Sequence, residues 1–422
     1  MTSAEAIAPE AMSAATAVME QLKTTCCIAG GGPAGMMLGL LLARAGIDVV
    51  VLEKHTDFFR DFRGDTIHPS TLEVMAELGL LGAFLQLPHQ KAAQLGGRFG
   101  DFDFALADFS HLPTQCKFVA LMPQWDFLNF LAQQAAGYPG FRLLMGCEAT
   151  TLLRENGRVA GLQAKTPSGK IEIRADLTIA ADGRQSTMRQ QAALAVTDRG
   201  APMDVLWFRL PRQADDPEQP LGRFVAGTVM VMINRGDYWQ CGFVILKGGL
   251  AAVQQRGLAE LRQQIGAVAP FLGERVETLR DWDEIKLLSV QVNYLQQWYQ
   301  PGFLCIGDAA HAMSPIGGVG INLAIQDAVA AGNILAEPLR NGGITEADLR
   351  QVQERRLLPT RLTQALQVAA QNFLTRKVLA GTGRLDPPLF LRLMSRYPLL
   401  RRLPARLIGM GFRPEHVRDS EA

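Results

Sequence analysis

The residues whose types and spacing suit binding chemistry best lie in one stretch, from Leu304 to Asn322. It begins as a short apolar run, which is typical of a buried strand, and continues through Gly307 and Asp308 into a glycine-rich loop. An apolar helix should follow from Ile321 to about Leu339. A strand, a loop and a helix in this order bring backbone N–H groups and the positive end of a helix together. The stretch predicts a site for an anionic or electron-rich ligand, although an ordinary crossover turn has a similar pattern.

Two kinds of residue in this stretch have distinct chemical uses. Asp308 directly follows the strand, so its carboxylate can accept hydrogen bonds from the hydroxyls of a sugar or a ribityl chain. Gly317, Gly318 and Gly320 leave no side chain between the backbone and a flat ring.

A second group of glycines follows a strand expected at 24–29. Gly30, Gly32 and Gly35 have the spacing G-x-G-x-x-G, and Glu53 comes about twenty residues later, where a carboxylate can accept from the hydroxyls of a ribose. Strand, glycines, helix, second strand and terminal glutamate together predict a dinucleotide site. A glutamate favours a ribose with a free 2′-hydroxyl, hence FAD or NAD rather than NADP.

The elements that must position these residues alternate between strands and helices. Pro33 suits the first turn of a helix, where a missing N–H costs nothing, and this helix should extend to about Arg44. Strands are expected over 48–52 and 177–181, the second ending at the acidic turn Asp182-Gly183. This alternation predicts an α/β fold.

Composition excludes several classes of protein. The 422 residues have a net charge of +1, which argues against nucleic-acid binding by charge, and 48% are hydrophobic, enough for a sizeable core. None of the six cysteines forms a C-x-x-C pair, so we expect buried thiols in a reducing, cytoplasmic compartment and no metal site. The N-terminus lacks the pattern of a secretory signal, and no uninterrupted apolar run reaches membrane-spanning length.

Strand and turn patterns divide the chain into four regions. Residues 1–23 are expected to be a tail, and residues 24–90, 123–195 and 296–345 a discontinuous nucleotide-binding domain. Residues 91–122 and 196–295 should form an antiparallel sheet beside it, and residues 346–422 should be helical with Pro359 as one of the breaks. Aromatic residues in the sheet fit a flat apolar ligand or an ordinary sheet core: Trp207, Phe208, Phe224, Trp239 and Phe243.

Three of these segments, in this order, resemble the FAD-dependent aromatic monooxygenases similar to para-hydroxybenzoate hydroxylase, the single-component flavoprotein hydroxylases. They are Gly30–Gly35 with Glu53, the turn Asp182-Gly183, and Gly307-Asp308 with Pro315–Asn322. The resemblance covers about residues 24–345. It implies a GR2-type flavoprotein fold, with a Rossmann-like FAD-binding domain, an inserted antiparallel β-sheet substrate domain and C-terminal helices.

The resemblance also implies which residues contact FAD: Gly30, Gly32, Ala34, Gly35, Glu53, Lys54, Arg63, Gln124, Asp182, Gly307, Asp308, Pro315, Gly317, Gly318, Val319, Gly320, Ile321 and Asn322. Asp308 would bind the ribityl chain, and Asp182 would serve both FAD and the nicotinamide cofactor. A helix N-terminus beside the isoalloxazine ring would stabilise the anionic reduced flavin. Taken alone, Arg63 is equally well a solvated loop charge, and Gln124 a helix cap. Asp65 departs from the family, which usually has a small residue there.

The implied reaction is hydroxylation of an aromatic or related electron-rich small molecule. NADH or NADPH reduces the flavin, O₂ adds to give a flavin C4a-hydroperoxide, and one oxygen atom passes to the substrate, without a metal or a side-chain nucleophile. His68, His111 and His311 are candidates for a base that ionises a phenol, although each is more often structural. The protein would be a monomer or a homodimer.

Three alternatives remain open. A protein of this fold could reduce isoprenoid double bonds or halogenate, could hydroxylate a quinone precursor at a membrane, or could bind FAD or another ligand without turnover. Halogenation needs a lysine near the flavin, and none lies between Cys305 and Leu374. The arginine-rich segment Leu385–Arg418 is either a solvated helix face or a peripheral contact with anionic lipid.

Overall fold

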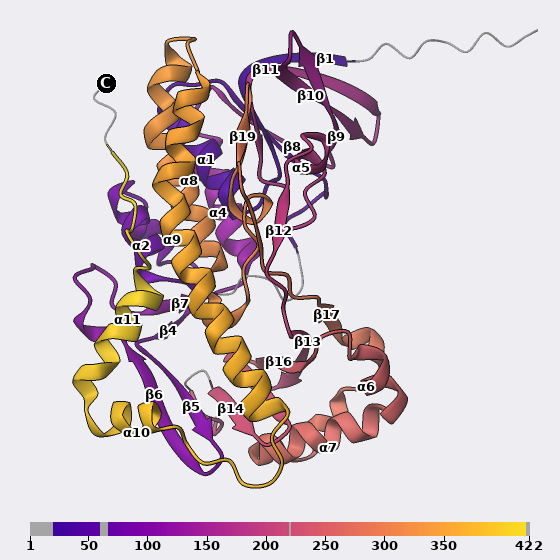
Figure 1. Ribbon diagram of the computed structural model, residues 1–422, viewed down its shortest axis with the longest axis vertical. Helices are drawn as coiled ribbons and strands as arrows, with labels where there is room; N and C mark the ends of the chain where they lie inside the picture. Colours follow the sequence, from indigo (N-terminus) through magenta and orange to yellow (C-terminus); the bar gives the residue numbers. More distant parts are fainter. Residues whose placement is uncertain (1–19, 60–65, 219–220, 419–422) are drawn as a thin grey trace, which may run out of the picture.

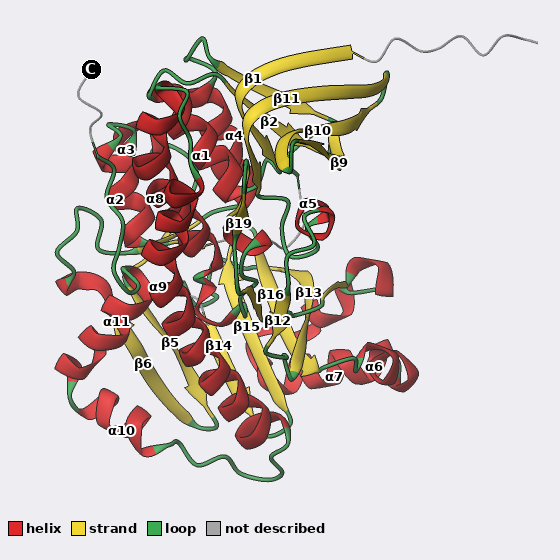
Figure 2. Ribbon diagram, turned by 45° about the horizontal axis from the view of Figure 1, so that its top comes forward, coloured by secondary structure: helices red, strands yellow, loops and turns green. Residues whose placement is uncertain are grey.

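Two large β-sheets and two long helices form the framework of the protein (Figure 1). The computed structural model describes residues 20–59, 66–218 and 221–418. Helices α8 (Gly320–Arg340) and α9 (Glu346–Phe373) lie side by side, and α9 extends from the region of the first sheet toward the second. Figure 2 shows the strands of the two sheets at opposite ends of the molecule.

The first sheet contains the strands expected to bind a nucleotide. Its main path is β19, β20, β11, β1, β2, β8, and β10 and β9 continue from β11. The neighbours from β20 to β8 along this path are parallel. The strands are β1 (Glu20–Ala29), β2 (Val49–Glu53), β8 (Phe141–Met145), β9 (Glu148–Glu155), β10 (Arg158–Thr166), β11 (Gly169–Ala180), β19 (Tyr299–Gln300) and β20 (Phe303–Cys305).

Helices bury the apolar residues of this sheet. Parallel sheets are normally covered on both faces, and residues 26–29 and 49–52 are accordingly at most 1% exposed. Helix α1 (Pro33–Arg44) packs against α4 (Gln124–Ala135) and α8, where a Cβ added at Gly332 would lie 3.2 Å from Cβ of Leu41. Among the described helices, the segment Ile316–Arg340 is long and apolar enough to cross a membrane, but 78% of its most apolar window is buried inside this protein. Its apolar residues therefore serve the core.

The second sheet has the order β17, β13, β16, β15, β14, β5, β6. Its pairs are antiparallel, as expected, except that β14 and β5 are parallel. Leu206 and Phe208 pack under α6 (Leu250–Arg256) and α7 (Leu258–Val268), whereas Val205 and Trp207 point to the opposite face. The strands are β5 (Gln94–Phe99), β6 (Phe102–Asp108), β13 (Met203–Pro211), β14 (Leu221–Val225), β15 (Thr228–Asn234), β16 (Tyr238–Leu246) and β17 (Lys286–Leu288).

Short elements connect the two sheets. They are the strands β3 (Thr66–Ile67), β4 (Gln90–Ala92), β7 (Val119–Leu121), β12 (Val196–Asp198) and β18 (Asn293–Leu295), and the helices α2 (Pro69–Glu77), α3 (Leu81–Phe84) and α5 (Thr187–Gln191). A π-helical turn (Leu374–Leu379) follows α9, and α10 (Leu389–Arg396) and α11 (Arg402–Gly409) pack on β6.

Two expectations about element boundaries were wrong. Strand β1 begins at Glu20, because residues 20–23 pair with 171–174 of β11 instead of belonging to a tail. Pro359 does not break a helix, since α9 continues through it. The hydrogen bond that the missing N–H of Pro359 cannot make to the carbonyl four residues earlier is tolerated because α9 packs along α8.

Candidate active site

The predicted motifs meet at one edge of the first sheet. Residues at the carboxyl ends of four parallel strands pair across it, Ala29 with Ala180 and Leu52, and Ala180 with Cys305. The motif residues come at or just after these ends: Gly30, Glu53, Asp182 and Gly307. In open α/β sheets, ligands bind outside the carboxyl ends of the strands.

Gly30 is a position that admits no side chain. Its φ is +111°, and an added Cβ would lie 2.3 Å from the carbonyl oxygen of Ala181. A Cβ added at Gly35 would lie 2.0 Å from the carbonyl oxygen of Gly30, so α1 packs directly on the strand end. Gly307, with φ +59°, is close to Ala34, whose Cβ would lie 3.1 Å from an added Cβ. The glycine motif, the acidic turn and the Gly-Asp turn are therefore in direct contact.

Gly32 has open space around it, in contrast to Gly30 and Gly35 of the same motif. A Cβ added to it meets no atom within 4 Å, and it caps the N-terminus of α1. An open position without a side chain at a helix N-terminus suits a phosphate. Glu53 accepts from the N–H of Gly31 at 3.2 Å and from the N–H of His55 at 3.1 Å, which holds its carboxylate beside the glycine loop. This cradle, with the carboxylates of Glu53 and Asp308, fits the pyrophosphate and hydroxyls of FAD.

The carboxylate of Asp182 is engaged within its own turn. It accepts from Ser186 Oγ at 2.5 Å and from the N–H of Met188 at 3.0 Å, and so holds the start of α5. Burial raises the pKa of Asp182, and the hydrogen bonds from Ser186 and from backbone N–H groups act in the opposite direction. Its contribution to nicotinamide handling stays a prediction.

Arg189 joins two of the motifs and was not singled out by the sequence. Its side chain is 5% exposed; Nη1 donates to the carbonyl of Ala309 at 3.0 Å and Nη2 to that of Arg184 at 2.8 Å. It therefore fixes the turn after Asp182 against the turn that contains Asp308. Asp308 itself is half-buried in a short 3₁₀ turn, Gly307–Ala309.

The loop Pro315–Gly320 is shaped by two glycines with positive φ, Gly317 (+77°) and Gly318 (+63°). Thr66 Oγ1 donates to the carbonyl of Gly318 at 2.9 Å. Asn322 is buried, and its Oδ1 accepts from the N–H of His68 at 3.0 Å and from Thr71 Oγ1 at 2.7 Å. Asn322 thus holds the start of α2 against the start of α8 and supports the loop from behind.

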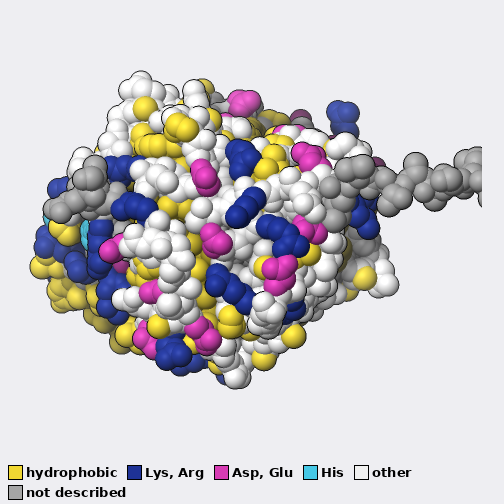
Figure 3. All heavy atoms as spheres, turned by 90° about the horizontal axis from the view of Figure 1, so that it is seen from above, with side chains coloured by type: hydrophobic (Ala, Val, Ile, Leu, Met, Phe, Trp, Pro, Cys, Tyr) yellow, Lys and Arg dark blue, Asp and Glu magenta, His cyan; other side chains and the backbone are white. Residues whose placement is uncertain are grey.

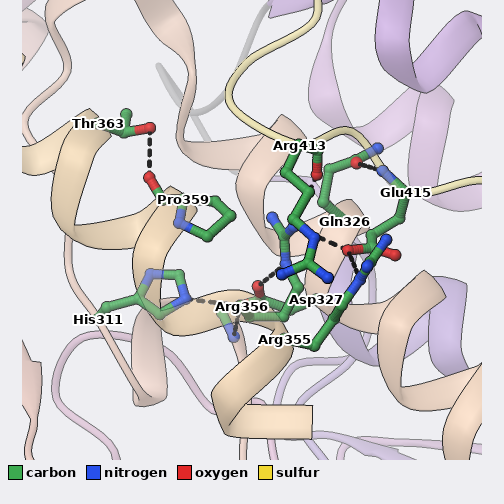
Figure 4. A network of polar contacts seen from close by, with 10 residues as sticks. His311, Gln326, Asp327, Arg355, Arg356, Pro359, Thr363, Arg413 and Glu415 are labelled. Carbon is green, nitrogen blue, oxygen red and sulfur yellow. Dashed lines mark hydrogen bonds and ion pairs between the residues drawn. The ribbon is translucent and has the colours of Figure 1, made fainter.

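A buried polar network connects His311, Asp327 and Arg356 (Figure 4). Asp327 Oδ2 accepts from the N–H of Gly307 at 3.0 Å and lies 2.6 Å from His311 Nε2, while Oδ1 accepts from Arg356 Nε at 3.0 Å. Glu415 pairs with Arg356 and with Arg355, at 3.2 and 2.7 Å. The C-terminal segment is therefore linked through α9 and α8 to the turn at Gly307. The sequence signal that could have found Asp327 is that it is the one charged residue in the stretch 320–336, which is otherwise uncharged and mostly apolar.

The three histidines considered as bases each contact another group of the protein. His68 is fully buried, and its Nδ1 donates to the carbonyl of Ile408 at 2.7 Å. Burial lowers the pKa of His68 to about 4, so it is neutral and a weak base near pH 7. His311 is held by Asp327, and the exposed His111 lies 3.3 Å from Arg402.

The remaining predicted contacts are spread around the same edge. Lys54 is exposed at the end of β2, and Gln124 is the half-buried first residue of α4. Val319 and Ile321, at the start of α8, are buried. Arg63 and Asp65 lie outside the described residues.

The five aromatic residues singled out in the sequence lie on two different faces of the second sheet. Phe208, Trp239 and Phe243 belong to the core under α7. Trp207 and Phe224 lie on the other face, in a cluster that includes Ile316 of the loop Pro315–Gly320. Only these two have the right orientation to meet a ligand between the sheet and the loop.

A transverse row of residues crosses the face of the second sheet that carries Trp207 and Phe224. Trp207, Gly242, Val231 and Gly222 pair successively across the strands. Val231 is 37% exposed, although its same-face neighbours on β15, Val229 and Ile233, are 1% and 8% exposed.

Two aromatic rings border this row. Cβ atoms added at Gly242 and Gly222 would lie 3.1 Å from the ring of Trp207 and 2.9 Å from that of Phe224. Val231 is therefore an exposed position between two aromatic side chains, and this part of the sheet is hereafter called the inner trough.

Comparison with known proteins agrees with this geometry. A family model described as an FAD binding domain matches residues 23–365. A 6-methylpretetramide 4-monooxygenase of Streptomyces rimosus is 32% identical over 405 residues, 94% of each chain. A para-nitrophenol 4-monooxygenase of a Pseudomonas species is 25% identical and covers 76% of this chain and 79% of that relative.

A solved structure shows the same fold. The p-nitrophenol 4-monooxygenase of Pseudomonas putida superposes with a TM-score of 0.75 at 19% identity, covering 94% of this chain and 100% of the other. The family match includes the strands, turns and glycines of the cradle. The chain thus belongs to the family of FAD-dependent aromatic monooxygenases whose FAD binding domain spans residues 23–365 here.

Proposed function

We propose that this protein hydroxylates a flat aromatic compound bound in the inner trough, with NADH or NADPH as electron donor and O₂ as oxygen source. The balanced reaction consumes the reduced nicotinamide, a proton and O₂, and yields the oxidised nicotinamide, water and a product with one added oxygen atom. The observation that carries the substrate assignment is the exposure of Val231 between its buried same-face neighbours Val229 and Ile233. The relative named 6-methylpretetramide 4-monooxygenase supports an aromatic substrate.

The cofactor supplies electron transfer and O₂ activation when bound, and the chain supplies position and a dry environment. Gly32 would let the backbone approach the pyrophosphate, Gly30 and Gly35 let α1 pack on the strand end, and Asp308 would hold the ribityl chain. The start of α8 would face the ring, since the Gly317-Gly318 turn ends there.

The inner trough would orient the substrate. The rings of Trp207 and Phe224 lie over Gly242 and Gly222, on either side of the exposed Val231, so a planar aromatic ring bound over Val231 would stack against them. Ile316 belongs to the cluster on one side of the trough, and Ile408 and Met410 belong to the cluster on the other side, which limits access of water.

The test is consumption of NADH and of NADPH by the purified holoenzyme with a panel of aromatic compounds, including 6-methylpretetramide and para-nitrophenol. We expect slow consumption without substrate, acceleration by a fitting compound, and a product that gains one oxygen atom by mass spectrometry. Release of hydrogen peroxide alone would contradict productive hydroxylation. Anaerobic reduction of a substrate double bond would instead assign a reductase, and failure of both nucleotides to reduce the bound flavin would refute the proposal.

We also propose a cytoplasmic location. All six cysteines are buried and unpaired, and burial raises the pKa of Cys147 to about 11, so these thiols are kept as protonated core residues. Thiols of this kind suit a reducing compartment.

A further inference from the structure

The end of the chain forms an exposed surface that the oxygenase reaction does not use. Residues 387–414 contain six arginines and no aspartate, glutamate or lysine. They form α10, a short turn (Pro398–Arg401) and α11, at the outer side of β6 (Figure 1). We call α10, this turn and α11 the C-terminal surface.

Only one side of these helices contributes to the core. Leu391 and Ala405 are 3% and 0% exposed, and a Cβ added at Gly409 would lie 2.8 Å from Leu112, so the inner side packs tightly. The outer side is apolar as well: Leu389, Leu399 and Leu403 are 70%, 68% and 65% exposed. Further outward side chains are Phe390, Leu393, Tyr397 and Leu400. Contiguous exposure of this kind marks an interaction site.

The arginines beside these apolar residues are not neutralised. Arg392 donates to the carbonyl of Pro387, Arg401 to those of Met394 and Ser395, and Arg402 contacts His111. Across the described ranges, no arginine of the C-terminal surface has a carboxylate within ion-pair distance. In contrast, the face seen in Figure 3 shows basic and acidic side chains interspersed.

We propose that the C-terminal surface binds the surface of an anionic lipid bilayer. Amphipathic helices with arginines beside exposed leucines insert their apolar side at the headgroup boundary, while the charges attract anionic lipid. A second copy of this chain fits poorly, because a two-fold contact of this surface with itself would place arginines against arginines. Lipid supplies both the negative charge and the apolar layer that the surface lacks.

Binding there would bring the inner trough near the membrane. Ile408 and Met410, at the end of the same segment, belong to the cluster that contains Trp207. An apolar aromatic compound dissolved in the bilayer would then have a short path to the site. The docking itself does not depend on the substrate proposal, and its test uses no turnover.

The test is flotation of the full-length protein with vesicles of phosphatidylcholine alone or with 30% phosphatidylglycerol added. We expect binding to the anionic vesicles at low salt and release at high salt. Replacing two charges in R402Q/R406Q should weaken binding about 30-fold, which corresponds to roughly 1 kcal/mol for each basic residue. L399S/L403S should also weaken binding, but without changing its salt dependence.

Matched controls change equally exposed residues elsewhere. R256Q/R280Q removes two charges from the α6–α7 side, and L358S removes an exposed leucine from α9. Both should bind like the unchanged protein. Equal binding to neutral vesicles, no binding at low salt, or equal weakening by the controls would each overturn the proposal. A dimer that L399S/L403S dissociates, without any vesicle binding, would assign the surface to self-association instead.

Discussion

Nε2 of His311 lies 2.6 Å from Oδ2 of Asp327, and both side chains are at most 1% exposed. The same carboxylate accepts from the N–H of Gly307 and from Arg356. Burial alone would raise the pKa of Asp327, but the charges and hydrogen bonds of His311 and Arg356 outweigh it and hold the pKa below its usual value. A charged carboxylate in the core therefore fixes the backbone at the Gly307-Asp308 turn.

Asp327→Asn should lower both stability and flavin retention. Arg356 would keep Glu415 as its partner but lose the charge of Asp327, and breaking a buried pair costs about 3–5 kcal/mol. We expect the free energy of unfolding, measured in urea, to fall by an amount at the lower end of that range. FAD binding should also be weaker. Asp103→Asn breaks an exposed pair with Arg98 and should change neither quantity measurably. An unchanged unfolding midpoint for Asp327→Asn would contradict the role of the network.

Gly32→Val and Gly30→Ala should fail for different reasons. Valine at 32 would project into the open cradle, so the variant should fold normally and be purified without FAD. Alanine at 30 would meet the carbonyl of Ala181 at 2.3 Å with an unfavourable φ, so that variant should lose stability. Flavin absorbance and thermal unfolding separate the two effects. Normal flavin content in Gly32→Val would remove the dinucleotide assignment.

The sequence predicted what depends on local spacing. Gly30, Gly32, Gly35 and Glu53 are recognisable because one strand, one turn and one helix fix their geometry. Asp327 was missed because its partners lie 16, 29 and 20 residues away, at His311, Arg356 and Gly307, and only packing brings them together.

The inner trough could not be predicted from the sequence for a related reason. It depends on the pairing of Val231 with Gly222 and Gly242, and strand register cannot be read from one strand alone. Alternation did predict that aromatic residues occupy the sheet, but not which face each one takes. The error at Pro359 has the opposite cause, since a reliable local rule was overridden by packing of α9 on α8.

Asp308→Ala should weaken FAD binding more than Asp182→Ala does. We propose that the carboxylate of Asp308 accepts directly from the ribityl chain, and a hydrogen bond to a charged group contributes about 1.5–3 kcal/mol. Asp182 instead holds the start of α5, so its replacement should mainly slow flavin reduction by NAD(P)H. FAD titration and stopped-flow reduction measure the two effects. The reverse order would overturn the assigned roles.

Val231→Trp should block the substrate without affecting the cofactor. The new ring would fill the space between Trp207 and Phe224, so substrate should no longer accelerate NAD(P)H consumption while FAD content stays normal. Leu287→Trp is the matched control, because Leu287 is 44% exposed on the edge strand β17. Unchanged acceleration in Val231→Trp would show that substrate binds elsewhere.

Asp216→Asn should destabilise the second sheet in a pH-dependent way. Asp216 is 7% exposed; Arg275 donates to both of its oxygens, at 2.5 and 2.8 Å, and Trp239 Nε1 donates at 2.8 Å. The hydrogen bonds from Arg275 lower the pKa of Asp216 to about 2, from an ordinary 3.8. A depressed carboxyl pKa stabilises the fold at pH values above the unfolded pKa.

The free energy of unfolding at pH 7 should therefore fall by roughly 2 kcal/mol in Asp216→Asn. The difference in unfolding free energy between the variant and the unchanged protein should persist down to about pH 4. It should close as the pH falls toward 2, since protonation then removes the charge of Asp216 in the unchanged protein as well. Urea unfolding at several pH values measures this gap. Asp215→Asn changes the exposed neighbour and should lie within about 0.5 kcal/mol of the unchanged protein throughout. A gap that stays constant between pH 7 and pH 2 would mean that Asp216 acts through its shape and not through its charge.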